Sequence, residues 1–585
     1  MEISLKRFMV CRIKPVDLWY LARTETNKHI SELDFLNPVP IYDINGTYQG
    51  IIDYNRLYDP SSQSFFDFNL RKKLGLAING TEWIDIDSYA PETFSLDMFS
   101  ADELLNNGKS YIEYAGYDYT GKKLGSQPSL DDFFNQKDVY GNNTRVIGAF
   151  NPIYRTAYIQ YTFTGKKINA QIGVRGDFYN ANQMKLKDPY LLYEARTAKT
   201  VTNLGGHPDN IGENYVVYVN DAHNPTSIVG YRDLGNWYNA AGTKIEDPAL
   251  LETPSGIAPY LLNPHQTQIN SSPFEIYKTV FNFLPSFSIN YDFFPKYQLF
   301  GSYQANTQNP NRYCQLRPDQ YFFIENQDYI LNNPALKPEK VVKAKIGVKR
   351  MFFSSFLAVA SFNYINIENK VLLKYYYEAY PCSYYTYANT NKNFVRNTLD
   401  FSIKYYKPGE KEINIGIYYS LLFKSKDSIH FTPFTKHIAN SFINYRFNKK
   451  VIIDNQIIQR PVFGISLIHH FRSKTDYSDY LYEYELPIFQ YFDVKIEKPF
   501  YFGKNFSTSA FVMVQNIFNT KNIFSVYPNT NKPDNDGFLN APGSQALIQQ
   551  QTNEQSFRDL YAVNMNNPNF YDTPRMLIFG IRFGL

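Results

Sequence analysis

The chain has 585 residues, of which 17% are aromatic, with 51 Tyr and 47 Phe but only 3 Trp, and its mean hydropathy is −0.41. No run of about 18 apolar residues occurs, so the sequence excludes a membrane-spanning helix. Spanning strands need only about 9–11 residues and alternate lipid-facing with water-facing side chains, so a transmembrane β-barrel stays compatible with this composition. The 59 basic and 55 acidic residues are spread without a basic block, and we expect no nucleic acid partner.

The N-terminal part of the chain shows no signal peptide. The opening "MEISLKRFMVCRIKPVDLW" has polar and charged residues where an export signal would have about 7–15 apolar ones. We predict that residues 1–150 form an incomplete N-terminal barrel segment with long loops. Residues 151–585 are expected to form the C-terminal transmembrane β-barrel portion. The cysteines, Cys11, Cys314 and Cys382, are odd in number and lack CxxC spacing, so a disulfide framework is not indicated.

Two-residue alternation begins near residue 153 and recurs to the C-terminus. In "KINAQIGVRGDFY" one face carries Ile168, Ala170, Ile172, Val174 and Phe178, and the other carries Asn169, Gln171, Arg175 and Asp177. One face suits lipid and the other suits water. The same pattern in "EINIGIYYSLLF" and later segments predicts roughly a dozen strands or slightly more. A soluble β-sandwich or propeller would show the same alternation, because the pattern does not say whether the apolar face meets lipid or a core.

The connections between these strands are unequal in length. "KPGEK" at 407–411 is short enough for a hairpin, whereas the stretch from 180 to 272 is long and rich in Asn, Gly, Pro and Tyr. Short turns on one side and long loops on the other are typical of outer-membrane barrels, whose long loops are extracellular. A structureless loop of this length would be unusual inside a compact soluble domain. The inequality therefore favours the barrel.

The last twelve residues, "PRMLIFGIRFGL", predict a closing strand over 575–585. Its lipid-facing side would carry Leu577, Phe579, Ile581, Phe583 and Leu585. An unbroken apolar face on a terminal strand suits a barrel in which the last strand closes against the first and displays such a face to lipid. The segment also resembles the terminal strand by which outer-membrane barrels are recognised for insertion. That pattern normally ends in an aromatic residue, whereas Leu585 ends this chain.

Three segments resemble the barrel of TonB-dependent receptors, in particular the large, SusC-like type with a carboxypeptidase-regulatory-like domain ahead of the plug. They are "GAFNPIYRTAYIQYTFTGKKINAQIGVRGDFYNANQMKLKDPYLLY" (148–193), "NPALKPEKVVKAKIGVKRMF" (333–352) and "FVMVQNIFNTKNIFSVYPNT" (511–530). The resemblance covers about residues 100–585 and implies an all-β, antiparallel transmembrane barrel in the outer membrane of a Gram-negative cell. Without the family, Pro334 and Pro338 already predict a turn before a strand, because proline donates no ladder hydrogen bond.

The resemblance also implies partners. These are outer-membrane lipid, a surface lipoprotein, and a TonB energy-coupling complex that acts through a plug domain. We expect the plug to be absent from this chain and the barrel to be N-terminally truncated, as in a split or truncated reading frame. Large receptors of this kind use about 22 strands, more than the alternation predicts here.

Few residues suggest a chemical site, and we expect no catalytic, metal or cofactor site. The sequence has no GxSxG, Walker A, HExxH or GxGxxG motif. "DNDG" (534–537) fits a polar turn better than a calcium loop, and adjacent His469 and His470 on one strand would point to opposite faces. Arg175 and Arg582 on the lumen face could line a substrate path, but solvated wall charges explain them better.

These observations predict a receptor that imports a bulky nutrient, such as an oligosaccharide or a peptide, and catalyses no reaction. Long Tyr- and Asn-rich loops such as 214–242 would form the outer face of its substrate site, because rings offer stacking faces among hydrogen-bonding amides. One alternative is a passive porin-like or adhesive barrel, or a non-functional remnant of a split receptor gene. Another is a soluble, secreted carbohydrate-binding protein or hydrolase.

Overall fold

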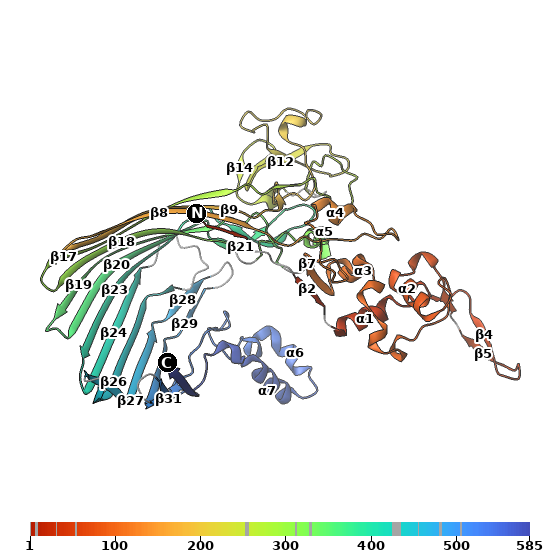
Figure 1. Cartoon of the computed structure of the whole chain (residues 1–585). Coiled ribbons are helices and arrows are strands. Elements are labelled where there is room, and N and C mark those ends of the chain that lie inside the picture. The colour runs from red at the N-terminus through yellow and green to blue at the C-terminus, as the bar shows by residue number, and fades with distance from the viewer. Residues whose placement is uncertain are drawn as a thin grey trace.

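The structure is a computed structural model of the whole chain. It describes all residues except 1, 6–9, 14, 31, 53–54, 252–256, 311–312, 327–329, 424–433, 454–455, 479–482, 503–505 and 585. A long curved sheet dominates it, and the connections at one end of the sheet fold into a separate head (Figure 1).

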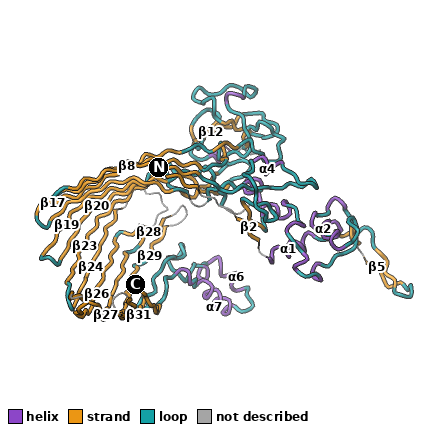
Figure 2. Tube along the Cα trace, in the orientation of Figure 1, coloured by secondary structure: helices purple, strands orange, loops and turns teal. Residues whose placement is uncertain are grey.

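Fourteen of the described strands form this sheet, and every neighbouring pair in it is antiparallel. In order they are β1 (Glu2–Leu5), β8 (Ile153–Thr164), β9 (Ile168–Asn180), β17 (Val280–Phe294), β18 (Tyr297–Gln308), β19 (Glu339–Phe352), β20 (Phe356–Glu368), β23 (Phe394–Lys407), β24 (Lys411–Phe423), β26 (His437–Ile453), β27 (Gln456–Arg472), β30 (Phe489–Phe502), β31 (Phe506–Gln515) and β32 (Met576–Gly584). Figure 2 shows how these strands curve side by side. The all-β, antiparallel fold expected from the alternation is confirmed.

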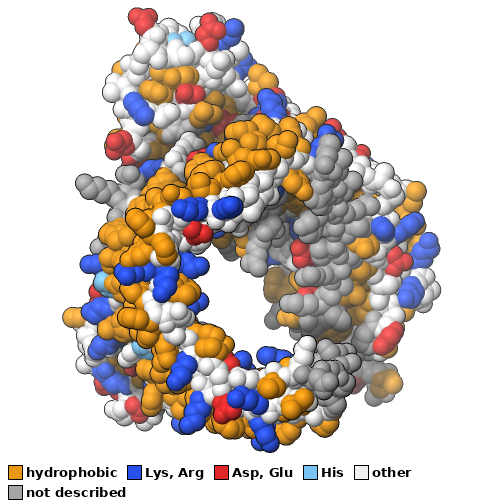
Figure 3. Space-filling view, turned by 60° about the vertical axis from the view of Figure 1, so that its left-hand side comes forward, with side chains coloured by type: hydrophobic (Ala, Val, Ile, Leu, Met, Phe, Trp, Pro, Cys, Tyr) orange, Lys and Arg blue, Asp and Glu red, His pale blue; other side chains and the backbone are white. Residues whose placement is uncertain are grey.

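The strand register sorts side chains by polarity between the two faces of the sheet. In β23 and β24, Ile403 pairs with Ile417 on one face, and Asp400 pairs with Ser420 on the other. Ile403 and Ile417 are 56% and 53% exposed, and large apolar side chains are exposed in the same way on most other strands. Figure 3 shows these hydrophobic side chains on the outside of the curved wall, while Lys and Arg gather around a central hollow. A surface of this kind suits contact with lipid rather than water.

Aromatic rings cover glycines on the inner face of the wall. A Cβ atom at each of these glycines would overlap the ring of the residue on the next strand, in the pairs Gly347 with Phe300, Gly416 with Phe442, and Gly580 with Phe511. Glycine lets the ring lie flat on the neighbouring backbone, which fixes the strand register and allows the sheet to curve. The inner face is thus kept open by rings that lie along the wall.

The connections alternate strictly between short and long. The turns 165–167, 295–296, 353–355 and 408–410 join hairpins at one end of the sheet, and the connections 181–279, 309–338, 369–393 and 516–575 leave the other end. Because β8 ends at a short turn, the segment 6–152 between β1 and β8 belongs to the long-connection end. The predicted asymmetry of the loops is confirmed.

The long connections carry short elements of their own. The first 150 residues contain β2 (Val10–Ile13), α1 (Pro15–Glu25), β3 (Glu32–Asp34), β4 (Val39–Tyr42), β5 (Tyr48–Ile52), β6 (Asn55–Leu57), α2 (Phe65–Leu74), α3 (Ala101–Leu105), β7 (Ile112–Ala115) and α4 (Leu130–Asn135). Of the described elements in this stretch, β1 alone joins the large sheet. Division of the chain at residue 150 stays a prediction.

Later connections contain a small sheet and further hairpins. They hold β10 (Met184–Leu186), β11 (Val216–Val219), β12 (Ile228–Asp233), β13 (Asn236–Asn239), β14 (Lys244–Ile245), β15 (Ala258–Pro259), β16 (Phe274–Ile276), α5 (Pro318–Phe322), β21 (Val371–Tyr376), β22 (Tyr384–Asn389), β25 (Phe434–Thr435), β28 (Thr475–Ser478), β29 (Glu483–Leu486), α6 (Gln545–Gln549) and α7 (Glu554–Met565). The strands β14, β13, β12, β11 and β15 pair in that order. The described residues of the stretch 180–272 are therefore folded.

One hydrophobic core joins several of these connections into the head. It contains Phe66 and Phe133 from the first stretch, Trp237 from 181–279, Tyr321 from 309–338 and Tyr384 from 369–393. Burial of large rings contributes roughly 1.5–3 kcal/mol each relative to leaving them exposed. Contacts between segments far apart in the sequence thus hold the head together.

Candidate functional site

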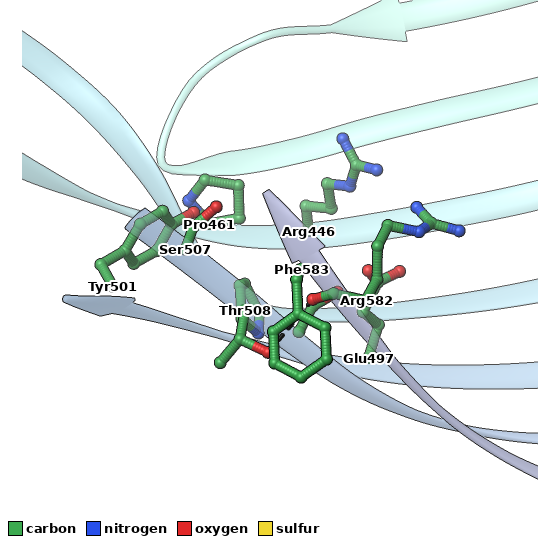
Figure 4. Close-up of a pocket in the computed structure, with 11 residues that line it drawn as sticks. Arg446, Pro461, Glu497, Tyr501, Ser507, Thr508, Arg582 and Phe583 are labelled. Carbon is green, nitrogen blue, oxygen red and sulfur yellow. Dashed lines mark hydrogen bonds between the residues drawn. The ribbon is translucent and has the colours of Figure 1, made fainter. Parts of the chain in front are cut away.

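The inner wall near the C-terminal strand carries a cluster of charged side chains. Arg582 of β32, Arg446 of β26 and Glu497 of β30 line a depression of about 230 Å³ (Figure 4). The register places all three on the same face. Glu497 and Arg446 both pair with Gly464 of β27. Arg582 pairs with Ser509 of β31, which pairs in turn with Pro499, two residues from Glu497 along β30. Lys495 Nζ lies 2.7 Å from Glu497 Oε2. Three cations surround one carboxylate, so this part of the wall is basic.

Arg175 lies on the same inner face, at the other side of the sheet. Its guanidinium forms two hydrogen bonds with Asp177, of 2.6 and 2.7 Å. The Asp177 carboxylate also accepts hydrogen bonds from Thr156 and Thr307. The Arg175 side chain is 46% exposed. Arg175 is therefore held in place by its neighbours and still presents charge to the hollow.

The four described apolar residues of the predicted closing strand lie on the outer face. Leu577, Phe579, Ile581 and Phe583 are each between 59% and 70% exposed. Leu585 lies outside the described residues. The neighbouring strand β31 pairs with β32 along its whole length. Within the described part of the chain, no ladder joins β32 to β1.

The hairpin of β21 and β22 belongs to the connection 369–393, which leaves the long-connection end of the wall. Val371 and Tyr387, at the end of the hairpin near the wall, pack together with Tyr154 against a buried cluster that contains Tyr179. Tyr154 and Tyr179 pair across β8 and β9 on the face that also carries Arg175. The hairpin therefore rises from the inner face of the wall into the long-connection end.

A buried arginine organises the part of the head that lies next to this hairpin. The Arg232 side chain is fully buried, and its Nη2 lies 2.7 Å from Asp188 Oδ2. Its Nε donates to the Tyr218 hydroxyl at 2.9 Å, and its guanidinium lies over the rings of Tyr190 and Trp237. Burial raises the pKa of Tyr218 to about 12, although Arg232 acts in the opposite direction. The phenol thus stays neutral at physiological pH and can accept this hydrogen bond.

Three of the five aromatic rings in the loop 214–242 are buried. Tyr218, Tyr231 and Trp237 are at most 3% exposed and belong to the packing of the head. These rings are buried because the strands β11 to β13 fold over the Arg232 pair. Several exposed rings lie on the β21–β22 hairpin, in the connection between β20 and β23. The sequence "VLLKYYYEAYPCSYYTYAN" carries Leu373, Tyr375 and Tyr377 at two-residue spacing, which could have indicated this hairpin.

The described residues contain no group of three or more His, Cys, Asp and Glu side chains that could hold a metal ion. His469 stacks on Phe492 and His470 stacks on Tyr491. The two partners are adjacent in β30, so the histidines point to opposite faces as predicted. At 534–537, Asp536 accepts hydrogen bonds from Tyr561 Oη and Phe538 N, which makes this segment a polar turn.

No helix within the described ranges is long and apolar enough to cross a membrane. A sheet with an apolar outer face, a charged hollow, short turns at one end and long connections at the other is the wall of a transmembrane β-barrel. In agreement with this class, the sequence matches the family described as "TonB dependent receptor-like, beta-barrel" over residues 18–517. The chain belongs to the TonB-dependent receptor-like β-barrel family, whose members lie in the outer membrane.

Several solved structures are similar to this chain at low identity. They include the FrpB iron transporter from Neisseria meningitidis (12% identity, 64% of this chain and 41% of that chain, TM-score 0.34) and the copper transporter OprC (11%, 77% and 51%, TM-score 0.35). The siderophore receptor PirA from Acinetobacter baumannii is a third (11%, 66% and 54%, TM-score 0.32). This chain therefore spans about half the length of the solved structures it matches. No curated protein matches it in sequence.

Proposed function

We propose that this chain is the barrel part of a TonB-dependent outer-membrane receptor that imports a bulky nutrient, such as an oligosaccharide or a peptide, and catalyses no reaction. The observation that carries this proposal is the hollow itself. Its wall presents apolar side chains outward and charged side chains inward, and folded connections gather at one end only. A receptor needs this polarity, because a ligand must be captured outside and passed through a polar channel.

In this proposal residues 1–150 are an incomplete N-terminal segment of the barrel with long loops, and residues 151–585 form the rest of the wall up to the closing strand. Arg175 and Arg582 are solvated charges of the inner wall. The basic cluster around Glu497 keeps this wall hydrated. A TonB complex would supply energy through a plug domain, and a surface lipoprotein would meet the long-connection end.

Uptake by the host organism tests this proposal. A strain with an in-frame deletion of the coding sequence is compared with the complemented strain for growth on oligosaccharides or peptides as sole carbon source. We expect growth on at least one of these to require the chain, and to be lost again when TonB is inactivated in the complemented strain.

Inactivation of TonB distinguishes the proposed receptor from the main alternative, a passive barrel. Growth that needs the chain but not TonB would contradict an energised receptor and would identify a passive, porin-like barrel. Equal growth of all strains on every nutrient would contradict import. Surface attachment of the same strains then tests for an adhesive role.

A further inference from the structure

The long-connection end carries a strip of exposed tyrosines, and it points to the chemical class of the ligand. Tyr375 and Tyr385 are directly opposite each other on β21 and β22, and their ring centroids are 4.4 Å apart. The two side chains are 44% and 50% exposed. Tyr377, 38% exposed, continues the row with its ring 6.3 Å from that of Tyr375. We call these three residues the tyrosine strip.

A second ring pair extends the same face toward the wall. Tyr387 lies two residues along β22 from Tyr385, which is about 6.6–6.8 Å along a strand. It stacks with Tyr313 from the connection 309–338, with centroids 4.5 Å apart and an interplanar angle of 26°. The distance between successive rings in the row is therefore of the same order as the length of one sugar unit. It continues down to the inner face of β8 and β9, where Tyr387 packs.

The opposite face of the hairpin explains why these rings stay exposed. Tyr376 and Tyr384 point to that face and are at most 7% exposed, within the core of the head. The buried face anchors the hairpin, and Thr386 donates a hydrogen bond to the Leu331 carbonyl there. Because side chains alternate along a strand, the tyrosine strip is left facing away from the core. The buried face thus holds the strip in place on the surface of the head.

None of the ladder positions on the strip face of the β21–β22 hairpin holds a charged side chain. These six positions are occupied by Val371, Leu373, Tyr375, Tyr385, Tyr387 and Asn389. Free peptides carry charged ends, and anionic ligands need cations to recognise them. A neutral sugar instead offers flat apolar C–H faces for stacking and hydroxyls for hydrogen bonds, and tyrosine supplies both a ring and a hydroxyl.

We propose that the tyrosine strip, continued by Tyr387 and Tyr313, binds a neutral oligosaccharide by stacking against successive sugar rings. The inference rests on the proposed receptor function and names the substrate class of the same site. Stacking there would hold the ligand at the long-connection end of the wall. The strip is the point at which the ligand is first recognised.

Binding to the full chain in detergent tests the proposal without any need for uptake. The probes are neutral hexasaccharides of glucose, mannose, xylose and fructose, with tripeptides to hexapeptides as a second panel. We expect at least one hexasaccharide to bind, and the double variant Tyr375→Ala with Tyr385→Ala to raise its Kd about tenfold or more. The double variant Tyr375→Phe with Tyr385→Phe keeps the rings, and its Kd should stay within about threefold of the original.

The matched control replaces another exposed tyrosine pair on a hairpin. Tyr42 and Tyr48, on β4 and β5, are 59% and 54% exposed, and their centroids are 5.9 Å apart. Tyr42→Ala with Tyr48→Ala should leave the Kd unchanged. Unchanged binding by the Tyr375 and Tyr385 alanine variant, or binding of peptides but of no hexasaccharide, would overturn the proposal.

The binding result and the uptake result are separable. Strip-dependent hexasaccharide binding without TonB-dependent growth would uphold the strip and contradict the receptor function. TonB-dependent growth on a peptide without hexasaccharide binding would uphold the receptor and overturn the strip. Wild-type chain that binds no member of the hexasaccharide panel would also overturn the strip.

Discussion

Replacing Phe579 with lysine is expected to destabilise the membrane-inserted barrel by about 2–4 kcal/mol, because the charge would enter the hydrocarbon region. Phe579 is 70% exposed on the outer face of β32. The measurement is the fraction of chain that keeps its folded, heat-modifiable migration in lipid vesicles over a series of urea concentrations.

The adjacent residue provides the control. Ile578 lies on the inner face, where it is opposite Met513 of β31. Ile578→Lys adds the same charge to the hydrated side of the wall, so we expect a shift within about 0.5 kcal/mol. Similar losses for both variants would show that β32 has no lipid-facing side. A larger loss for Ile578→Lys would reverse the assignment of the two faces.

Arg232→Met is expected to destabilise the head by about 2–3 kcal/mol, because it leaves the partly buried Asp188 carboxylate without its counterpart and the buried Tyr218 hydroxyl without its donor. Asp188 loses a 2.7 Å ion pair, and the Tyr218 hydroxyl loses its donor. The measurement is amide hydrogen exchange in β11 and β12, which should become faster while exchange in the wall strands stays slow.

An exposed ion pair from the same connection is the control for this variant. Lys199 lies 2.9 Å from Glu213, and both side chains are more than 60% exposed. Lys199→Met should change protection by less than about 1 kcal/mol, since surface ion pairs contribute little. If Arg232→Met exchanged no faster than Lys199→Met, the head would not depend on the buried pair.

The wall could be predicted from the sequence because each strand obeys a local rule. Alternation assigned Leu577 and Arg582 to opposite faces, and the structure places them there. Arg175 was likewise placed on the inner face with Asp177. Successive side chains of a strand point to opposite faces, so the face of each residue follows from its position in the strand. Contacts between distant segments were not needed for this prediction.

The head could not be predicted, because contacts between distant segments decide its structure. Nothing local distinguishes Trp237, which is buried over Arg232, from an exposed ring in an irregular loop. Asp188, the partner of Arg232, is 44 residues away from it along the chain. The tyrosine strip was missed for the same reason. Which face of its hairpin is buried depends on Tyr190, which comes from a different connection.

The most direct test of this account is the orientation of the chain in the outer membrane of intact cells. Single cysteines are introduced as Val139→Cys in the head and Lys166→Cys in the first short turn, in a background without Cys11, Cys314 and Cys382. Both positions are exposed. A membrane-impermeant maleimide should label Val139→Cys on intact cells, and Lys166→Cys only after lysis. Labelling of Lys166→Cys on intact cells, with Val139→Cys protected, would contradict a receptor that collects its ligand at the long-connection end.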